Sequence, residues 1–321
     1  MVVLSPSSPV RLAAPANVSP TVSTIETVGL TKYFGPHRGL EDLTLHVSPG
    51  EVLGFLGPNG SGKTTAIRIL MGFLRPTAGR ASVFGLDVLR DSLAIKQRVG
   101  YLPGDVALYG NRTGYQLLSF VARIRGVDEM PRAREVVDLL DAEMDRPIKK
   151  CSRGMRQKIA LVLTLAHDPD LLILDEPTTG LDPLAQRALL TLLDRLGQEG
   201  KTVFFSSHIL SEAEQICDRV AILRRGRLVA LSPVGKLREQ KYKEVTISYD
   251  GTLPQLNSLP DAEVIWQHEG RMTFRARGDT KALLAFLSGS SLTDVSISEP
   301  SLEEVFLDYY REEGAVEDAG S

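Results

Sequence analysis

One stretch of the chain has residue types and spacing suited to binding phosphate, Gly57-Pro58-Asn59-Gly60-Ser61-Gly62-Lys63-Thr64-Thr65. It matches the pattern G-x-x-x-x-G-K-[ST] in full. Glycines let backbone amides approach an anion closely and adopt conformations that a side chain would forbid. Lys63 could neutralise the β- and γ-phosphates of a nucleotide, and the hydroxyl of Thr64 could bind Mg²⁺. The loop therefore predicts a nucleotide site, with a chance glycine-rich turn as the alternative.

Two adjacent carboxylates, Asp175 and Glu176, end the apolar stretch 171–174. Side chains at the carboxyl end of a parallel strand project into the crevice where α/β proteins bind ligands. Mg²⁺ prefers oxygen ligands and keeps several waters, so we expect Asp175 to hold the ion largely through water. Glu176 is then suited to act as general base for the attacking water. The alternative is a solvated acidic turn after a core strand, which the phosphate loop in the same chain argues against.

A third stretch, Cys151-Ser152-Arg153-Gly154-Met155-Arg156-Gln157, lies just upstream of that strand. A serine hydroxyl and a glycine amide at a helix N-terminus are suitable donors to an anion. From the residues alone, Ser152 is also simply a helix N-cap. His208 follows the predicted strand at 202–206, and its imidazole could donate a hydrogen bond to a γ-phosphate. A lone histidine at a strand end is more often a surface residue.

Helices and strands must bring these residues together. Hydrophobic periodicity predicts a first strand that begins near residue 25 and further strands at 43–47, 52–56, 171–174 and 202–206. It predicts one helix from the phosphate loop to about residue 71 and two more at 156–167 and 184–198. The stretch from residue 90 to about 159 is predicted to be mostly helical. Alternating helices and strands are typical of a parallel sheet flanked by helices. The sequence therefore predicts an α/β fold with a helical subdomain at about 90–160.

The composition changes after residue 233, which indicates a second, smaller unit. Residues 243–249 and 271–277 alternate like strands, and 279–287 form an amphipathic helical pattern. Ser301 and Glu304 make a capping box for a final helix at 302–310. The predicted organisation is a flexible tail at 1–22, a nucleotide-binding domain at 23–233, an α+β accessory domain at 234–311 and a flexible tail at 312–321.

Composition limits the function further. With 321 residues and 43% hydrophobic content the chain can bury a substantial core. A net charge of -3 and a pI of about 6.0 argue against a nucleic-acid partner. Two cysteines argue against a disulfide scaffold or a zinc cluster and favour a reducing cytosol. No apolar run reaches the roughly 18–20 residues that cross a bilayer, so we expect any membrane-spanning part of the machine to come from another polypeptide.

The order of these motifs over residues 25–233 resembles the ATPase subunits of ABC transporters. The stretch Pro300-Ser301-Leu302-Glu303-Glu304-Val305-Phe306 resembles the end of export-type subunits, including daunorubicin-resistance ATPases. The resemblance implies a P-loop ABC-type ATPase core, with ATP and Mg²⁺ as cofactors. It also implies two partners, a second ATPase subunit (a homodimer) and an integral membrane permease, at the cytoplasmic face of the cell membrane. ATP would close two copies head to tail, and hydrolysis would release them to drive export of a drug, antibiotic, lipid or polysaccharide.

The resemblance also implies roles for individual residues. Ser152 and Gly154 keep the two positions of the family's Leu-Ser-Gly-Gly-Gln signature that contact the γ-phosphate held by the second copy. The flanking residues resemble a Ser-x-Gly-Met-x-Gln form common among bacterial export ATPases. Asp182, in a Gly-Leu-Asp-Pro element, corresponds to a residue facing the partner subunit, and His208 to the switch histidine. Phe34 corresponds to the ring that stacks on adenine, with Tyr33 as the second candidate.

The chain departs from the family at Gly104, where a Gln usually touches Mg²⁺ and links the site to the membrane subunit. Glycine offers no side chain for either task, so Asp105 or a water is the expected substitute. Two other functions are alternatives. A soluble ABC ATPase of translation or DNA repair usually has two cassettes, or coiled-coil or zinc insertions, which this chain lacks. A regulatory module with a vestigial ATPase is favoured by Gly104 alone and disfavoured by four intact residues, Lys63, Asp175, Glu176 and His208.

Overall fold

The structure is a computed structural model that describes residues 23–127, 130–239, 243–250, 256, 259, 262–276, 280–288 and 292–298. The expected flexible tails at 1–22 and 312–321 and the expected final helix at 302–310 lie outside the described residues.

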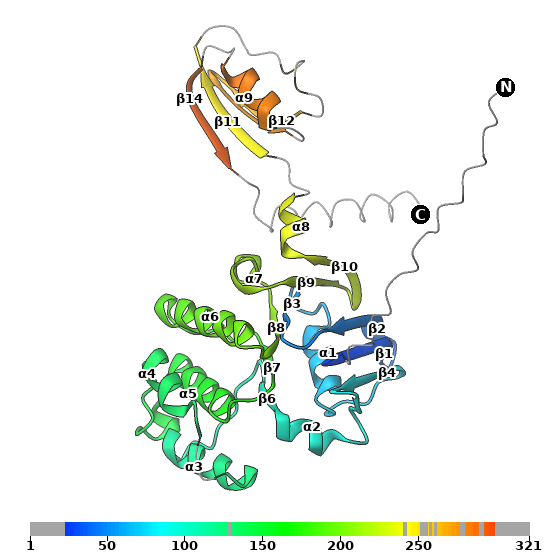
Figure 1. The fold of residues 1–321 in the computed structure, drawn as a ribbon, viewed down its shortest axis with the longest axis vertical. Coiled ribbons are helices and arrows are strands. Elements are labelled where there is room, and N and C mark those ends of the chain that lie inside the picture. Colours follow the sequence, from blue (N-terminus) through cyan, green and yellow to red (C-terminus); the bar gives the residue numbers. More distant parts are fainter. Residues whose placement is uncertain are drawn as a thin grey trace, which may run out of the picture.

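A six-stranded sheet lies at the centre of the nucleotide-binding part, as far as the structure describes it (Figure 1). Its strands, in spatial order, are β10 (Arg227–Pro233), β9 (Arg219–Arg224), β3 (Val52–Leu56), β8 (Thr202–Ser207), β7 (Leu171–Asp175) and β6 (Val99–Leu102). All neighbours run parallel except β10, which is antiparallel to β9. Because β3, β7 and β8 are adjacent and parallel, their carboxyl ends meet at one edge. The predicted parallel sheet is confirmed.

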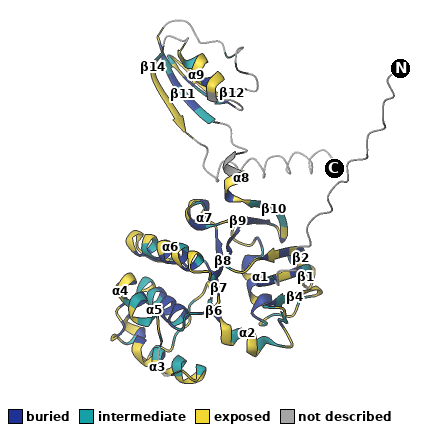
Figure 2. Ribbon diagram, viewed as in Figure 1, coloured by how far each residue is buried: buried dark blue, intermediate teal, exposed yellow. Residues whose placement is uncertain are grey.

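The strands of this sheet are apolar on both faces. Leu171 and Ile173 belong to one buried cluster, and Leu172 and Leu174 belong to the other. Successive side chains of a strand point to opposite faces, so continuous apolar runs fill both cores. All five residues of β7 are buried, including Asp175 at its end (Figure 2). Each fully buried leucine contributes about 1.5–3 kcal/mol, so the strand that carries Asp175 is firmly held.

An antiparallel sheet and two helices cover one face of the central sheet. The strands are β1 (Ile25–Phe34), β2 (His37–Val47), β4 (Ala78–Val83) and β5 (Leu86–Asp87), and the helices are α1 (Lys63–Leu70) and α2 (Ser92–Arg98). Ile25, Val47 and Val83 share a buried cluster with Ile67 of α1 and Phe55 of the central sheet. The sheet therefore holds the start of α1 against the end of β3.

Helices cover the other side. They are α3 (Gly114–Arg125), α4 (Ala133–Leu140), the short 3₁₀ helix η1 (Ile148–Lys150), α5 (Arg153–Leu165), α6 (Pro183–Gln198), α7 (Leu210–Ile216) and α8 (Val234–Glu239). Figure 1 shows α3, α4 and α5 gathered together beside the edge strand β6. The stretch from residue 90 to 159, predicted as mostly helical, thus contains a strand as well. β6 is only four residues long, too short for its periodicity to stand out from the helices around it.

The C-terminal residues form an antiparallel sheet with a helix. Its strand order is β12 (Glu263–His268), β13 (Arg271–Ala276), β11 (Lys243–Tyr249) and β14 (Leu292–Ser298), and the helix is α9 (Thr280–Ser288). Val245, Ile247, Met272, Phe274 and Leu283 form its own buried cluster. The α+β pattern expected from the sequence is present, with β12 and β14 as strands that the alternation did not reveal.

Candidate active site

The phosphate loop connects β3 to α1 and leaves no room for a side chain at Gly57 or Gly62. Gly62 is the N-cap of α1 with φ 110°. A Cβ there would lie 2.6 Å from the carbonyl oxygen of Gly39. A Cβ on Gly57 would lie 2.4 Å from the carbonyl oxygen of Leu223. Only glycine lets the backbone pass this closely, and the unpaired amides at the start of α1 are then available to an anion.

A cavity of about 160 Å³ lies against this loop. It is lined by Gly39, Asn59, Gly60, Ser61, Gly62, Lys63, Thr64, Thr65 and Glu176. The Oγ atom of Ser61 is buried and has no hydrogen-bond partner among the described residues. A buried hydroxyl of this kind is costly unless something accepts or donates a hydrogen bond, so the loop fits a bound phosphate.

Lys63 is held in the loop with its ammonium group at the cavity. Only 5% of the residue is exposed. Its Nζ donates to the carbonyl oxygens of Gly57 at 2.6 Å and Pro58 at 3.2 Å, and lies 3.6 Å from Oε1 of Glu176. Burial lowers the pKa of Lys63, and the charge of Glu176 opposes that shift. The ammonium group therefore lies between the phosphate loop and Glu176, the candidate catalytic carboxylate.

Asp175 sits in a cluster of oxygen atoms. Its Oδ2 accepts a hydrogen bond from the Thr64 hydroxyl at 2.8 Å, and its Oδ1 accepts one from the Ser206 hydroxyl at 2.5 Å. Ser206 lies directly opposite Asp175 on the neighbouring strand. Carboxylate and hydroxyl oxygens are the ligands that Mg²⁺ prefers. The donor set therefore fits a magnesium ion bound beside the phosphate loop.

Glu176 is the meeting point of the other predicted catalytic residues. Its backbone is in the left-handed region with φ 49°, and its amide donates to Ser206. Strain of this kind costs about 1–3 kcal/mol and is concentrated at functional sites. Nδ1 of His208 lies 3.4 Å from Oε1 of Glu176, and the Thr179 hydroxyl donates to Oε2 at 3.3 Å. The structure thus brings Lys63 and His208 onto the same carboxylate oxygen.

The described lining of the phosphate-loop cavity does not include Ser152, Gly154 or Asp182. These three residues lie together on another surface, at the starts of α5 and α6. Ser152 caps α5 by accepting a hydrogen bond from the Met155 amide at 3.2 Å. Asp182 caps α6 and lies 3.0 Å from the ammonium of Lys158 on α5. The Ala185 amide and then Lys158 lower the pKa of Asp182. The ion pair joins the two helix starts.

Gly154 brings these two helix starts into contact. A Cβ on Gly154 would lie 2.6 Å from the carbonyl oxygen of Gly180, so only glycine permits the approach. Gln157, one turn further along α5, is buried and donates to the carbonyl oxygen of Pro177 at 3.1 Å. The stretch after Glu176 is therefore fastened to α5 at two points.

Phe34 lies at the end of β1 and is half exposed. Lys32 Nζ is 5.3 Å from its ring centroid, and the ring edge packs against Gly39 of the cavity lining. The hydroxyl of Tyr33 instead donates to Glu41 at 3.1 Å. This arrangement leaves Phe34 the better placed of the two rings for stacking on a base beside the cavity.

Three residues that the sequence reasoning gave no role belong to the site, namely Ser206, Gly39 and Gln157. Ser206 could have been found because it lies near the carboxyl end of β8, beside the strand of Asp175, where hydroxyls can reach a metal site. Gly39 is far from the loop in sequence, and its contact with Gly62 has no local signal.

Gly104 faces Asp175, at the position where the family usually has Gln. A Cβ on Gly104 would lie 3.1 Å from Oδ2 of Asp175. Both Gly104 and Asp105 are exposed. The backbone therefore runs close to the candidate metal site without presenting a side chain to it, and the neighbouring carboxylate of Asp105 is available in the same loop.

We expect Asp105→Ala to raise the Mg²⁺ concentration needed for half-maximal ATP hydrolysis by about two- to fivefold, an effect of the size of one exposed charge interaction. The measurement is a Mg²⁺ titration of steady-state phosphate release, with Mg²⁺-dependent ATP binding as the second readout. Asp145→Ala, which removes an exposed carboxylate elsewhere, is the control. Unchanged Mg²⁺ dependence would discard the role of Asp105.

Comparisons with known proteins agree with this geometry. The ABC transporter family profile matches residues 40–179. The bacitracin transport ATP-binding protein of Bacillus licheniformis is 34% identical over 88% of this chain and 96% of its own length. The daunorubicin/doxorubicin resistance ATP-binding protein of Streptomyces peucetius is 35% identical over 91% and 93%. A solved ATP-binding subunit of an ABC transporter superposes with a TM-score of 0.62 and 31% identity, over 68% of this chain and 93% of that one. The chain therefore belongs to the ATP-binding subunits of ABC transporters, the ATPases that energise transport.

Proposed function

We propose that this subunit hydrolyses Mg²⁺-bound ATP with Glu176 as general base, Lys63 as phosphate ligand and His208 as the sensor of the γ-phosphate. The observation that carries the proposal is the convergence of Lys63 Nζ and His208 Nδ1 on one carboxylate oxygen of Glu176, at 3.6 and 3.4 Å. Thr64 and Asp175 would hold the metal ion, which supplies charge neutralisation for the phosphates. Glu176 would accept the proton of the attacking water while His208 donates toward the phosphate.

The active unit in this proposal is a pair of copies. Ser152, Gly154 and Asp182 lie on one surface, away from the described lining of the phosphate-loop cavity. The exposed Ser152 hydroxyl at the start of α5 is a suitable donor to an anion. It would contact the γ-phosphate of ATP held by the second copy, so each active site would draw on both chains.

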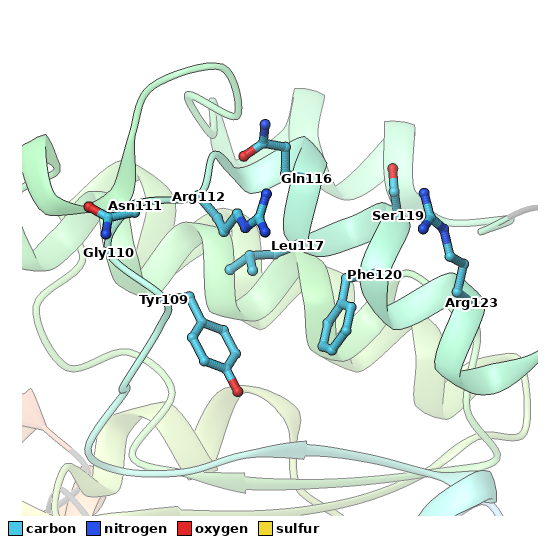
Figure 3. Close-up of a pocket in the computed structure, with 9 residues that line it drawn as sticks. All are labelled: Tyr109, Gly110, Asn111, Arg112, Gln116, Leu117, Ser119, Phe120 and Arg123. Carbon is cyan, nitrogen blue, oxygen red and sulfur yellow. The ribbon is translucent and has the colours of Figure 1, made fainter.

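The proposed membrane partner is an integral permease at the cytoplasmic face of the cell membrane. The structure contains a groove of about 890 Å³ on the helical side (Figure 3). It is lined by Tyr109, Gly110, Asn111, Arg112, Gln116, Leu117, Ser119, Phe120 and Arg123. Within the described residues, no helix combines the length and apolar character needed to cross a membrane.

Aromatic rings make this groove suitable for a protein segment. Tyr109 and Phe120 meet edge to face with centroids 6.5 Å apart and are 70% and 50% exposed. Arg112 and Arg123 place positive charge beside them (Figure 3). An amphipathic cytoplasmic segment of the permease, apolar toward the rings and acidic toward the arginines, would fit this lining.

The transported molecule is proposed to be an antibiotic or drug-like compound moved outward, with lipid and polysaccharide as the wider class. The support is the length of the match to the two relatives named for bacitracin transport and for daunorubicin/doxorubicin resistance, which covers 88% and 91% of this chain.

We expect Phe120→Asp to uncouple the subunit from its permease. A central aromatic contact contributes about 2 kcal/mol or more to an interface, so capture of the permease should fall by roughly 30-fold. The tagged chain is used to recover integral membrane proteins from detergent-solubilised membranes, and ATP-driven transport is measured with the recovered pair. Phe120→Leu, which keeps the groove apolar, is the matched control. Capture that is unaffected by Phe120→Asp would contradict this docking site.

A further inference from the structure

The C-terminal sheet has an edge strand that is exposed along its whole length. All six residues of β12, Glu263–His268, are exposed. Val264, Ile265 and Trp266 are apolar and consecutive, with 46%, 46% and 50% of each exposed. Figure 1 shows β12 and β14 on opposite sides of β11. A long apolar edge strand is a template for pairing with another strand, and soluble proteins usually protect such an edge.

The pairing of β12 with β13 contains a β-bulge at Ile265. Val264 lies opposite Phe274 and Trp266 lies opposite Thr273, so Ile265 has no counterpart on β13. An extra residue of this kind is left outside the ladder.

The polar residues at the two ends of β12 lie on one face of the sheet. Glu263 lies opposite Arg275 and His268 lies opposite Arg271, which places both on the face that also carries Trp266. The rings of Trp266 and His268 stack at 6.1 Å with an interplanar angle of 16°. The strand thus runs from an acidic end, through an apolar centre, to an imidazole end.

We propose that β12 is a docking surface for β12 of a second copy of this chain. An antiparallel pair about a two-fold axis sets Glu263 of each copy opposite His268 of the other, and Ile265 of each copy opposite Trp266 of the other. Such an interface is self-complementary, as a two-fold contact must be. A carboxylate meets an imidazole at both ends, where a hydrogen bond can form, and apolar side chains meet at the centre.

This contact is independent of nucleotide, which separates it from the ATP-dependent pairing proposed above. None of its residues lines the phosphate-loop cavity or shares the surface of Ser152 and Asp182. A Lys63→Ala chain, in which the phosphate loop is disabled, should therefore still associate through β12. Dimer formation by the Lys63→Ala chain without nucleotide therefore tests the β12 contact alone. The result does not depend on whether the ATP-bound pair of the proposed function forms.

The first test measures mass and tryptophan exposure in the full-length Lys63→Ala chain without nucleotide. Trp266 is the only tryptophan in the chain, so its fluorescence reports on β12 directly. We expect a dimer by sedimentation equilibrium, with acrylamide quenching of Trp266 that weakens as protein concentration rises. Ile265→Lys should weaken the dimer by at least about tenfold, because a desolvated charge replaces an apolar contact. Val295→Lys, on the exposed opposite edge strand β14, is the matched control and should leave it unchanged.

The second test fixes the register by exchanging charges. Glu263→Lys removes the carboxylate opposite His268, and His268→Glu sets two carboxylates opposite one another, so each should weaken the dimer by roughly threefold to tenfold. The double variant sets Lys opposite Glu and should recover at least the original affinity. Three results would each overturn the proposal. The first is a chain that stays monomeric, whatever the quenching of Trp266. The others are a dimer whose affinity Ile265→Lys leaves unchanged, and a double variant whose affinity does not recover.

Discussion

Replacing Glu176 by Gln is expected to remove nearly all ATP hydrolysis while leaving ATP binding intact. The amide keeps the size of the carboxylate but cannot accept the proton of the attacking water, and loss of a general base typically costs about 10²–10⁴ in rate. Lys63 and the phosphate loop, which would hold the nucleotide, do not depend on the charge of Glu176 for their position, because Lys63 is fixed by the carbonyls of Gly57 and Pro58.

The measurements are steady-state phosphate release and ATP binding by calorimetry. Since hydrolysis would release the two copies, the Glu176→Gln chain should also accumulate as an ATP-bound dimer, seen as a nucleotide-dependent rise in mass. Glu143→Gln, which removes an exposed carboxylate elsewhere in the chain, is the control and should behave like the unmodified protein. A fully active Glu176→Gln chain would show that another group is the base.

The chemistry around Glu176 could be predicted because it depends on short, local patterns. The phosphate loop combines a strand, a glycine run and a helix start within a few residues, and Asp175 and Glu176 follow an unbroken apolar run. Parallel strands that are buried on both faces must end at a common edge. That rule brings the ends of β3, β7 and β8 together without any knowledge of side-chain contacts.

Contacts between distant segments were not predictable in the same way. Gly39 and Gly62 touch because the β1–β2 hairpin folds over the phosphate loop, and Gln157 reaches Pro177 because α5 packs beside the end of β7. Neither residue type signals its partner. Both contacts follow from tertiary packing, which overrides local preference.

Edge strands were missed for a different reason. β6 is short, and β12 presents three apolar residues in a row with all of its positions exposed. Alternation in sequence reflects one buried and one solvated face, so a strand without a buried face carries no alternation to detect.

The second large effect is expected from Ser152→Arg. Ser152 is exposed at the start of α5, and its hydroxyl accepts the capping hydrogen bond from the Met155 amide. Loss of that cap costs about 1 kcal/mol, so the variant should still fold. A bulky cation in place of the hydroxyl would block the surface that the second copy's nucleotide is proposed to meet, and activity should fall by at least about 100-fold, the loss typical of a preorganised hydrogen-bond donor.

Mixing two inactive chains shows which copy each site draws upon. One chain carries Ser152→Arg with an intact phosphate loop, and the other carries Lys63→Ala with an intact Ser152. If Ser152 acts on the partner's nucleotide, the mixed pair contains one complete site, made from the loop of the first chain and the Ser152 surface of the second. ATP should then be retained by the mixture, and hydrolysis should recover in part, although each chain alone is inactive.

If Ser152 instead served the nucleotide of its own chain, the mixture would contain no complete site and would stay inactive. Ser288→Arg, which places the same side chain at an exposed serine on α9, controls for added bulk and charge and should keep full activity. Recovery on mixing, absent from either chain alone, therefore decides the matter, because only a site shared between copies can be rebuilt from two chains that are each defective in a different half.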